Sequence, residues 1–93
     1  MNQLNESDFN EIARLLRNIS RSNTKSSAKN DISNFNGLKN KINSSLSEYA
    51  QDKLSAAFIC ADEASGQVSD KESKIETFEN ELYKFQRIIN KPF

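Results

Sequence analysis

Residues that interrupt regular secondary structure are almost absent from this chain. In 93 residues, glycine occurs only at Gly37 and Gly66, and proline only at Pro92. β-Sandwiches and barrels need turn residues at short intervals, so this scarcity argues against a β-rich fold. Apolar residues instead recur three and four positions apart, which places them on one face of a helix. The sequence therefore predicts an all-α protein with a single domain over residues 1–93.

Two stretches at the ends of the chain carry this helical spacing. The first helix is predicted from Asp8 to Arg21, with Ser7 as its N-terminal cap. Its apolar face consists of Phe9, Ile12, Leu16 and Ile19. The last helix is predicted over residues 70–90, with a regular apolar seam. The seam consists of Ile75, Phe78, Leu82, Phe85 and Ile89.

The middle of the chain, residues 33–65, forms either one long helix or two helices broken near residues 44–47. Apolar positions continue through the whole segment, Tyr49 and Phe58 among them, which slightly favours one helix. Ile59 extends the apolar surface of residues 56–61 to a second side, so this helix is predicted to be central. With a turn at Gly66, the sequence predicts a small bundle of three helices, or four if the segment is broken. The bundle is built on a long antiparallel helical hairpin.

Residues 21–31 separate the first helix from this hairpin. They are rich in serine, asparagine and lysine, and Ala28 is their only apolar residue. Such a segment has nothing to anchor it to a core. We therefore predict an exposed, mobile linker.

The chain lacks the residue types on which most active sites depend. Histidine, the commonest general base and transition-metal ligand, is absent, and Cys60 is the only cysteine. One cysteine forms neither an internal disulfide nor a zinc cage. The neighbouring Asp62 and Glu63 disfavour a thiolate, so Cys60 is predicted to be a packing residue. We therefore predict no enzyme activity, no metal site and no cofactor.

Charge is unevenly distributed along the chain. Residues 12–47 hold seven basic side chains and one acidic one, whereas residues 48–81 hold nine acidic and three basic ones. Two groups are candidate partner-binding surfaces, although two solvated faces are the simpler interpretation. The basic group is Arg14, Arg17, Arg21, Lys25 and Lys29. The acidic group is Glu72, Glu76 and Glu79, with Tyr83 next to it.

These features favour binding over catalysis. Thirteen basic side chains balance thirteen acidic ones, which argues against a generally basic nucleic-acid binder. The predicted function is a non-enzymatic protein-interaction module: an inhibitor, adaptor or chaperone-like subunit. Small phage- or plasmid-encoded inhibitors of host enzymes or nucleoprotein defence complexes are an analogy by size and composition. The alternative is a small nucleic-acid-binding regulator that uses the basic group.

Another protein is therefore the expected partner. A homodimer through the apolar seam is marginally preferred over a monomer whose first helix covers that seam. No membrane association is expected, because no apolar run approaches the roughly 20 residues that span a bilayer. The single cysteine fits a reducing compartment, so the predicted location is the cytoplasm.

Overall fold

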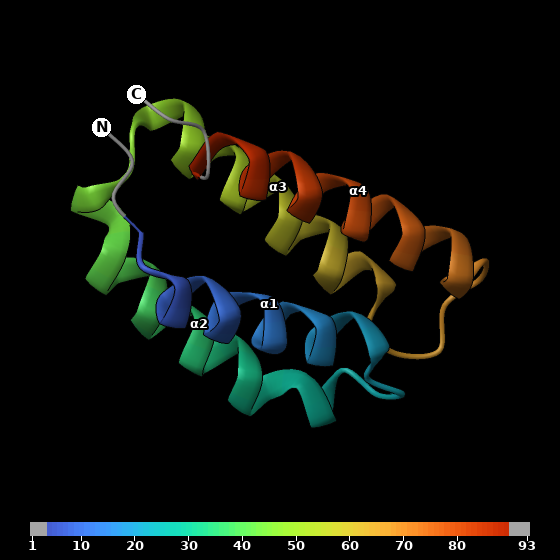
Figure 1. Cartoon of the computed structure of the whole chain (residues 1–93). Helices are drawn as coiled ribbons and strands as arrows, with labels where there is room; N and C mark the ends of the chain where they lie inside the picture. The colour runs from blue at the N-terminus through green and yellow to red at the C-terminus, as the bar shows by residue number, and fades with distance from the viewer. Residues whose placement is uncertain (1–3, 90–93) are drawn as a thin grey trace.

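The computed structural model describes residues 4–89 of the chain. Its elements are α1 (Glu6–Arg21), η1 (Ser26–Ala28), α2 (Lys29–Ile42), η2 (Asn43–Ser45), α3 (Glu48–Ala64) and α4 (Lys71–Ile89). No strand occurs within these residues, which confirms the all-α prediction. Successive helices run antiparallel, with α1 and α2 in one layer and α3 and α4 in the other (Figure 1). The bundle measures 40 × 23 × 19 Å.

Helix α1 holds the two layers together, because it contacts each of the other three helices. Its predicted apolar face is correct: Ile12, Leu16 and Ile19 are fully buried. The helix begins two residues before the predicted start, because its cap is Asn5 and not Ser7. The Asn5 side chain accepts a hydrogen bond from the backbone N–H of Asp8 at 2.7 Å, which satisfies one of the unpaired N–H groups of the first turn.

The preference for one helix over residues 33–65 is wrong, since the chain turns between α2 and α3. Leu46 adopts an extended conformation and is buried. The Ser47 hydroxyl then accepts from the N–H of Ala50 and caps α3. The Gln51 side chain donates to the carbonyl oxygens of Asn43 and Leu46 at 3.0 and 2.9 Å. These bonds replace those lost at the break, so the long arm of the predicted hairpin is two helices.

The second half of the predicted linker over residues 21–31 is helical, whereas its mobility stays a prediction. Residues 26–28 form η1, and α2 begins at Lys29. Ala28, the single apolar residue of the segment, is fully buried and anchors the turn. Lys25 adds a second anchor, because its ammonium donates to the carbonyl oxygen of Asp62 and to the Ser65 hydroxyl at the end of α3. Most other side chains of the segment are exposed, as predicted.

The apolar seam of α4 faces the interior of the same chain. Phe78, Leu82, Phe85 and Ile89 are buried, whereas Ile75 is half-buried. The ring of Phe9 in α1 stacks on Phe85, with 6.3 Å between centroids. The seam is therefore buried within the chain, where α3 and α1 pack on α4, and the homodimer stays a prediction. The predicted end of the helix at residue 90 lies outside the described residues.

A lysine closes the end of the bundle where α1 and α3 finish and α4 starts. The Lys71 ammonium donates to the carbonyl oxygens of Ser22, Ala64 and Gly66 at 2.9, 2.6 and 2.8 Å. Gly66 has φ = 83°, a left-handed conformation that glycine adopts without strain, and its N–H donates to the Ser22 carbonyl. The end of α1 and the segment between α3 and α4, which are distant in sequence, therefore meet around one ammonium.

Candidate partner-binding site

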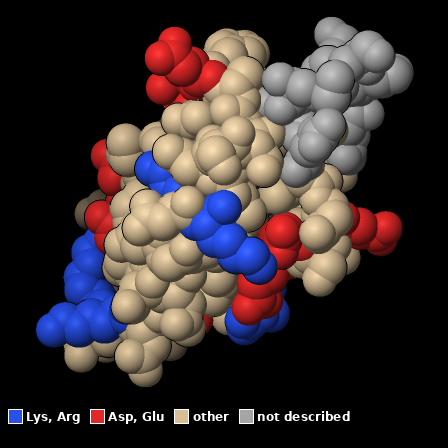
Figure 2. Space-filling model, turned by 90° about the vertical axis from the view of Figure 1, so that its left-hand side faces the viewer, with Lys and Arg blue, Asp and Glu red and all other residues tan. Residues whose placement is uncertain are grey.

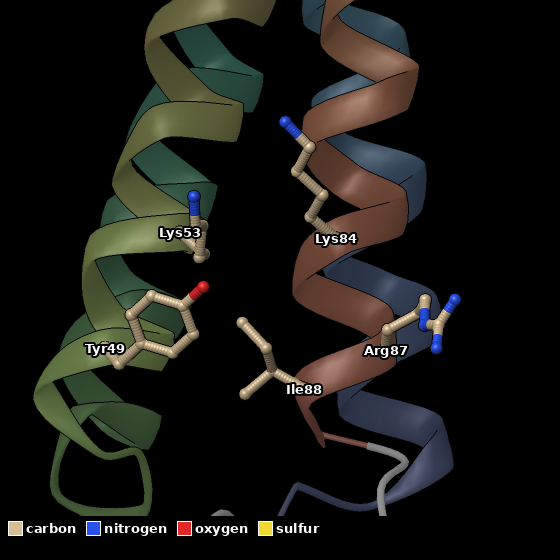
Figure 3. A pocket seen from close by; sticks show the side chains of 5 residues that line it. All are labelled: Tyr49, Lys53, Lys84, Arg87 and Ile88. Carbon is tan, nitrogen blue, oxygen red and sulfur yellow. The ribbon is translucent and has the colours of Figure 1, made fainter.

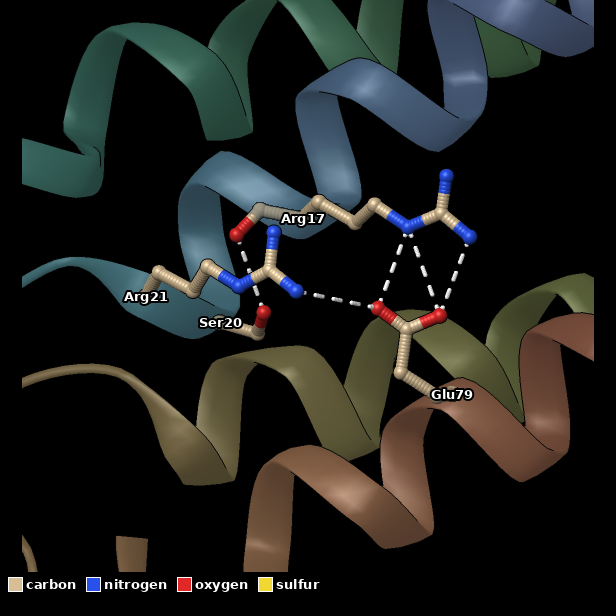
Figure 4. A network of polar contacts seen from close by, with 4 residues as sticks. All are labelled: Arg17, Ser20, Arg21 and Glu79. Carbon is tan, nitrogen blue, oxygen red and sulfur yellow. Dashed lines mark hydrogen bonds and ion pairs between the residues drawn. The ribbon is translucent and has the colours of Figure 1, made fainter. Parts of the chain in front are cut away.

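Two residues of the predicted basic group pair with one residue of the predicted acidic group. Arg17 donates to both carboxylate oxygens of Glu79 through Nε and Nη2, at 3.0–3.3 Å. Arg21 lies 3.6 Å from the same carboxylate, and Ser20 donates to the Arg17 carbonyl (Figure 4). The hydrogen bond to Glu79 raises the pKa of Arg17. This network joins α1 to α4, so these side chains already have partners within the chain.

The remaining members of the two predicted groups do not form one surface. Arg14 pairs with Glu11 of the same helix at 2.7 Å, and Lys25 is bound to the end of α3. Lys29 is exposed and makes no ion pair with any residue between 4 and 89. Glu72 and Glu76 are exposed on α4. The basic group is therefore largely occupied by contacts within the chain.

Large apolar side chains are exposed instead on α3 and α4. Tyr49, Ile59 and Tyr83 are 61, 56 and 58% exposed. This corrects two predictions: Tyr49 does not belong to the core, and the second apolar side of α3 faces solvent instead of a neighbouring helix. Among residues 4–89 no other large apolar side chain is as exposed. Exposed aromatic residues are enriched where proteins bind one another.

A pocket of about 270 Å³ lies between α3 and α4, the two helices that carry these exposed side chains. It is lined by Tyr49, Lys53, Lys84, Arg87 and Ile88. Figure 3 shows the Tyr49 hydroxyl and the Ile88 side chain pointing into the gap between the two helices, while Lys84 reaches from α4 toward α3. The Arg87 guanidinium points away from the gap (Figure 3). We call this pocket, with its five lining residues, the α3/α4 pocket.

Aromatic rings support two of the cations at this pocket. The Lys53 ammonium lies 5.6 Å from the centre of the Tyr49 ring, and the Arg87 guanidinium lies 5.9 Å from that of Tyr83. Both distances are typical of cation–π contacts. Lys84 donates to Glu81 at 2.8 Å, and this hydrogen bond raises the pKa of Lys84. Lys84 therefore remains charged at neutral pH.

Cys60 lies near the same interface of α3 and α4. It is half-buried and packs against the core. Burial raises the pKa of its thiol, and the carboxylates of Glu81 and Glu63 raise it further. A raised pKa leaves less thiolate, the nucleophilic form, at neutral pH. This agrees with the prediction of a packing cysteine.

Charged side chains of both signs are mixed on the end of the bundle that Figure 2 shows. Basic and acidic groups alternate there between uncharged areas, without a broad region of one sign.

Within residues 4–89, no three cysteine or acidic side chains are grouped so that they could hold a metal ion. None of the helices in this range is long and apolar enough to cross a membrane.

Sequence reasoning missed the α3/α4 pocket, although a local signal exists. Tyr49 and Lys53 are four residues apart, and so are Tyr83 and Arg87. This spacing places a ring and a cation side by side on a helix surface. Only Tyr83 was among the predicted site residues, and Tyr49 was placed in the core because it continues the apolar spacing. That two such pairs lie near one pocket depends on how α3 packs on α4.

Comparisons of the chain with protein-family models, with curated proteins and with solved structures find no match.

Proposed function

We propose that this protein is a non-enzymatic interaction module that binds another protein through the solvent-facing surface of α3 and α4. The observation that carries the proposal is the exposure of Tyr49, Ile59 and Tyr83 on these two helices. Burying a large apolar side chain against a partner removes it from water, which is favourable by about 1.5–3 kcal/mol per side chain. The core of the bundle is complete without these residues, so the protein gains this burial free energy only by binding a partner.

The proposed mode of action is occupation of a partner's surface, as in an inhibitor, adaptor or chaperone-like subunit. Cys60, the only cysteine, is half-buried with a raised thiol pKa, which suits packing and not catalysis. A free thiol of this kind also suits the reducing cytoplasm that we propose as its location.

The nucleic-acid alternative is less favoured because its candidate residues are already engaged. Arg17 and Arg21 bind Glu79, Arg14 binds Glu11, and Lys25 binds the end of α3. Neutralising several phosphates requires free cations on one surface. Of the five residues, only Lys29 is without such a contact among residues 4–89.

The test is affinity capture from a lysate of the source organism, with and without nuclease. The wild-type chain is compared with a Tyr49→Ala/Tyr83→Ala variant and with a control, Asn36→Ala/Asn40→Ala, whose residues are exposed on α2. We expect one dominant protein that survives nuclease, is retained by the control and is lost with the double tyrosine variant. Loss of all partners on nuclease treatment would support the nucleic-acid alternative. Equal capture by both variants would place the interface elsewhere.

A further inference from the structure

We propose that the α3/α4 pocket binds the carboxylate of an aspartate or glutamate side chain from the protein partner, with an apolar neighbour of that residue packing beside it. This inference deepens the proposed function and rests on it. It assigns the partner's chemistry at one place, where the pocket is lined by Tyr49, Lys53, Lys84, Arg87 and Ile88.

The pocket holds hydrogen-bond donors that the chain itself does not use. The Lys53 ammonium lies over the ring of Tyr49 and makes no ion pair with a carboxylate among residues 4–89. The Tyr49 hydroxyl, which points into the gap (Figure 3), likewise finds no partner in that range. Lys84 gives one of its three ammonium protons to Glu81. A carboxylate entering the gap would therefore meet donors from both helices.

The cations of this protein differ in whether their N–H donors are already used within the chain. Lys25 and Lys71 donate to backbone carbonyls, and Arg17 is bidentate to Glu79. Lys53 and Arg87 instead lie against aromatic rings. A ring attracts a cation but accepts no strong hydrogen bond from it, so the N–H donors remain free for an anion.

The walls of the pocket determine which anion fits best. The Ile88 side chain and the Tyr49 ring give it an apolar side (Figure 3), suited to an aliphatic neighbour of the carboxylate. The volume of about 270 Å³ suits a side chain better than a stretch of polymer. Glu48 and Asp52 are exposed on α3 next to Tyr49 and Lys53. They would repel the successive phosphates of a nucleic acid, whereas a single carboxylate can avoid them.

The test uses the purified full-length chain labelled with ¹⁵N and a short acidic peptide, acetyl-Ala-Leu-Asp-Leu-Ala-amide. Amide chemical shifts are followed up to about 10 mM peptide, since an isolated anchor of this size binds in the millimolar range. We expect saturable shifts at Tyr49, Lys53, Lys84 and Ile88. Lys53→Gln should weaken binding about threefold to fivefold, in proportion to one exposed charge contact. Lys29→Gln, which removes an exposed lysine from α2, should leave binding unchanged.

Three outcomes would overturn the inference. One is the absence of saturable shifts at the pocket. Another is equal binding of the same peptide with asparagine in place of aspartate. The third is saturation of the same amides by inorganic phosphate or by oligothymidylate at lower concentration than by the peptide. Any of these could occur while lysate capture still depends on Tyr49 and Tyr83, and in that case the proposed function stands and only the assigned carboxylate is wrong.

Discussion

Two groups of cations lie toward opposite ends of this bundle and have different surroundings. At the end where α1 and α3 finish, Arg17, Arg21, Lys25 and Lys71 meet one carboxylate and several backbone carbonyls. At the α3/α4 pocket, Lys53 and Arg87 meet aromatic rings. The first group links segments up to 62 residues apart in sequence, whereas each cation–ring pair of the second lies within one helix.

The difference shows that exposure and charge do not by themselves mark a binding surface. Arg17 and Lys53 are both partly exposed cations on helices. Arg17 already has a bidentate acceptor, so a partner's anion would have to compete with Glu79 for it. Lys53 has no such competitor among residues 4–89. The acceptors within reach of a cation thus separate a structural role from a binding role.

The largest effect is expected at Lys71. Lys71→Met keeps the aliphatic stem but leaves the carbonyls of Ala64 and Gly66 without their donor. Hydrogen bonds from a charged group contribute about 1.5–3 kcal/mol, so a loss of about 2–3 kcal/mol in the free energy of unfolding is expected. Urea denaturation followed by circular dichroism measures it. The control is Lys74→Met, because Lys74 is bonded to a single exposed carbonyl, that of Ser69. Equal losses of unfolding free energy in the two variants would show that the carbonyl contacts of Lys71 are not special, and would remove the distinction between the two groups of cations.

A smaller effect is expected from the Arg17–Glu79 pair. Both side chains are partly exposed, 46 and 31%, so solvent screens their attraction. A double-mutant cycle of Arg17→Ala and Glu79→Ala should give a coupling of about 0.5 kcal/mol, which falls as salt is added. Thermal unfolding at low and high ionic strength checks both points. No coupling at low salt would mean that the network of Figure 4 does not hold α1 to α4.

A kinetic effect without a change in fold is expected at Cys60. Glu81 raises the pKa of this thiol, and burial raises it more. Glu81→Gln should therefore lower the pKa of the thiol and increase the alkylation rate by iodoacetamide near pH 8. Lys84→Gln should act in the opposite direction, because Lys84 lowers the pKa of Cys60. Identical rates in both variants would show that Cys60 does not sense the charges beside the pocket.

The smallest effect on stability is expected at the pocket itself. Lys53→Gln and Arg87→Gln should each change the free energy of unfolding by less than about 0.5 kcal/mol, as surface substitutions without a bound acceptor do. The measurement is the same urea titration as for Lys71. A loss above about 1 kcal/mol at Lys53 would assign this cation to the fold and weaken its proposed role in binding.

The predicted site shows where sequence reasoning stops. The sequence correctly predicted that Arg17 and Glu79 are charged surface residues of two helices, but these residues were predicted to belong to separate binding surfaces. They face each other because α1 packs on α4, which the helical spacing does not encode. Tyr49 illustrates the converse error, since it continues the apolar spacing of residues 33–65 but lies at the edge of α3. A tyrosine satisfies the pattern of a core position whether or not a helix covers it.

The sequence by itself determined that the chain is helical and which faces of α1 and α4 are apolar. Those properties depend on the scarcity of glycine and proline, which occur only at Gly37, Gly66 and Pro92. They also depend on the spacing of apolar residues within about ten positions, which a helix converts directly into a face. Only the tertiary structure decided that α3 and α1 cover the seam of α4, that the chain breaks at 43–47, and which cations keep free donors. Each of these depends on groups brought together from distant positions, such as Lys71 with Ser22. Packing of whole helices, and not local spacing, sets those distances.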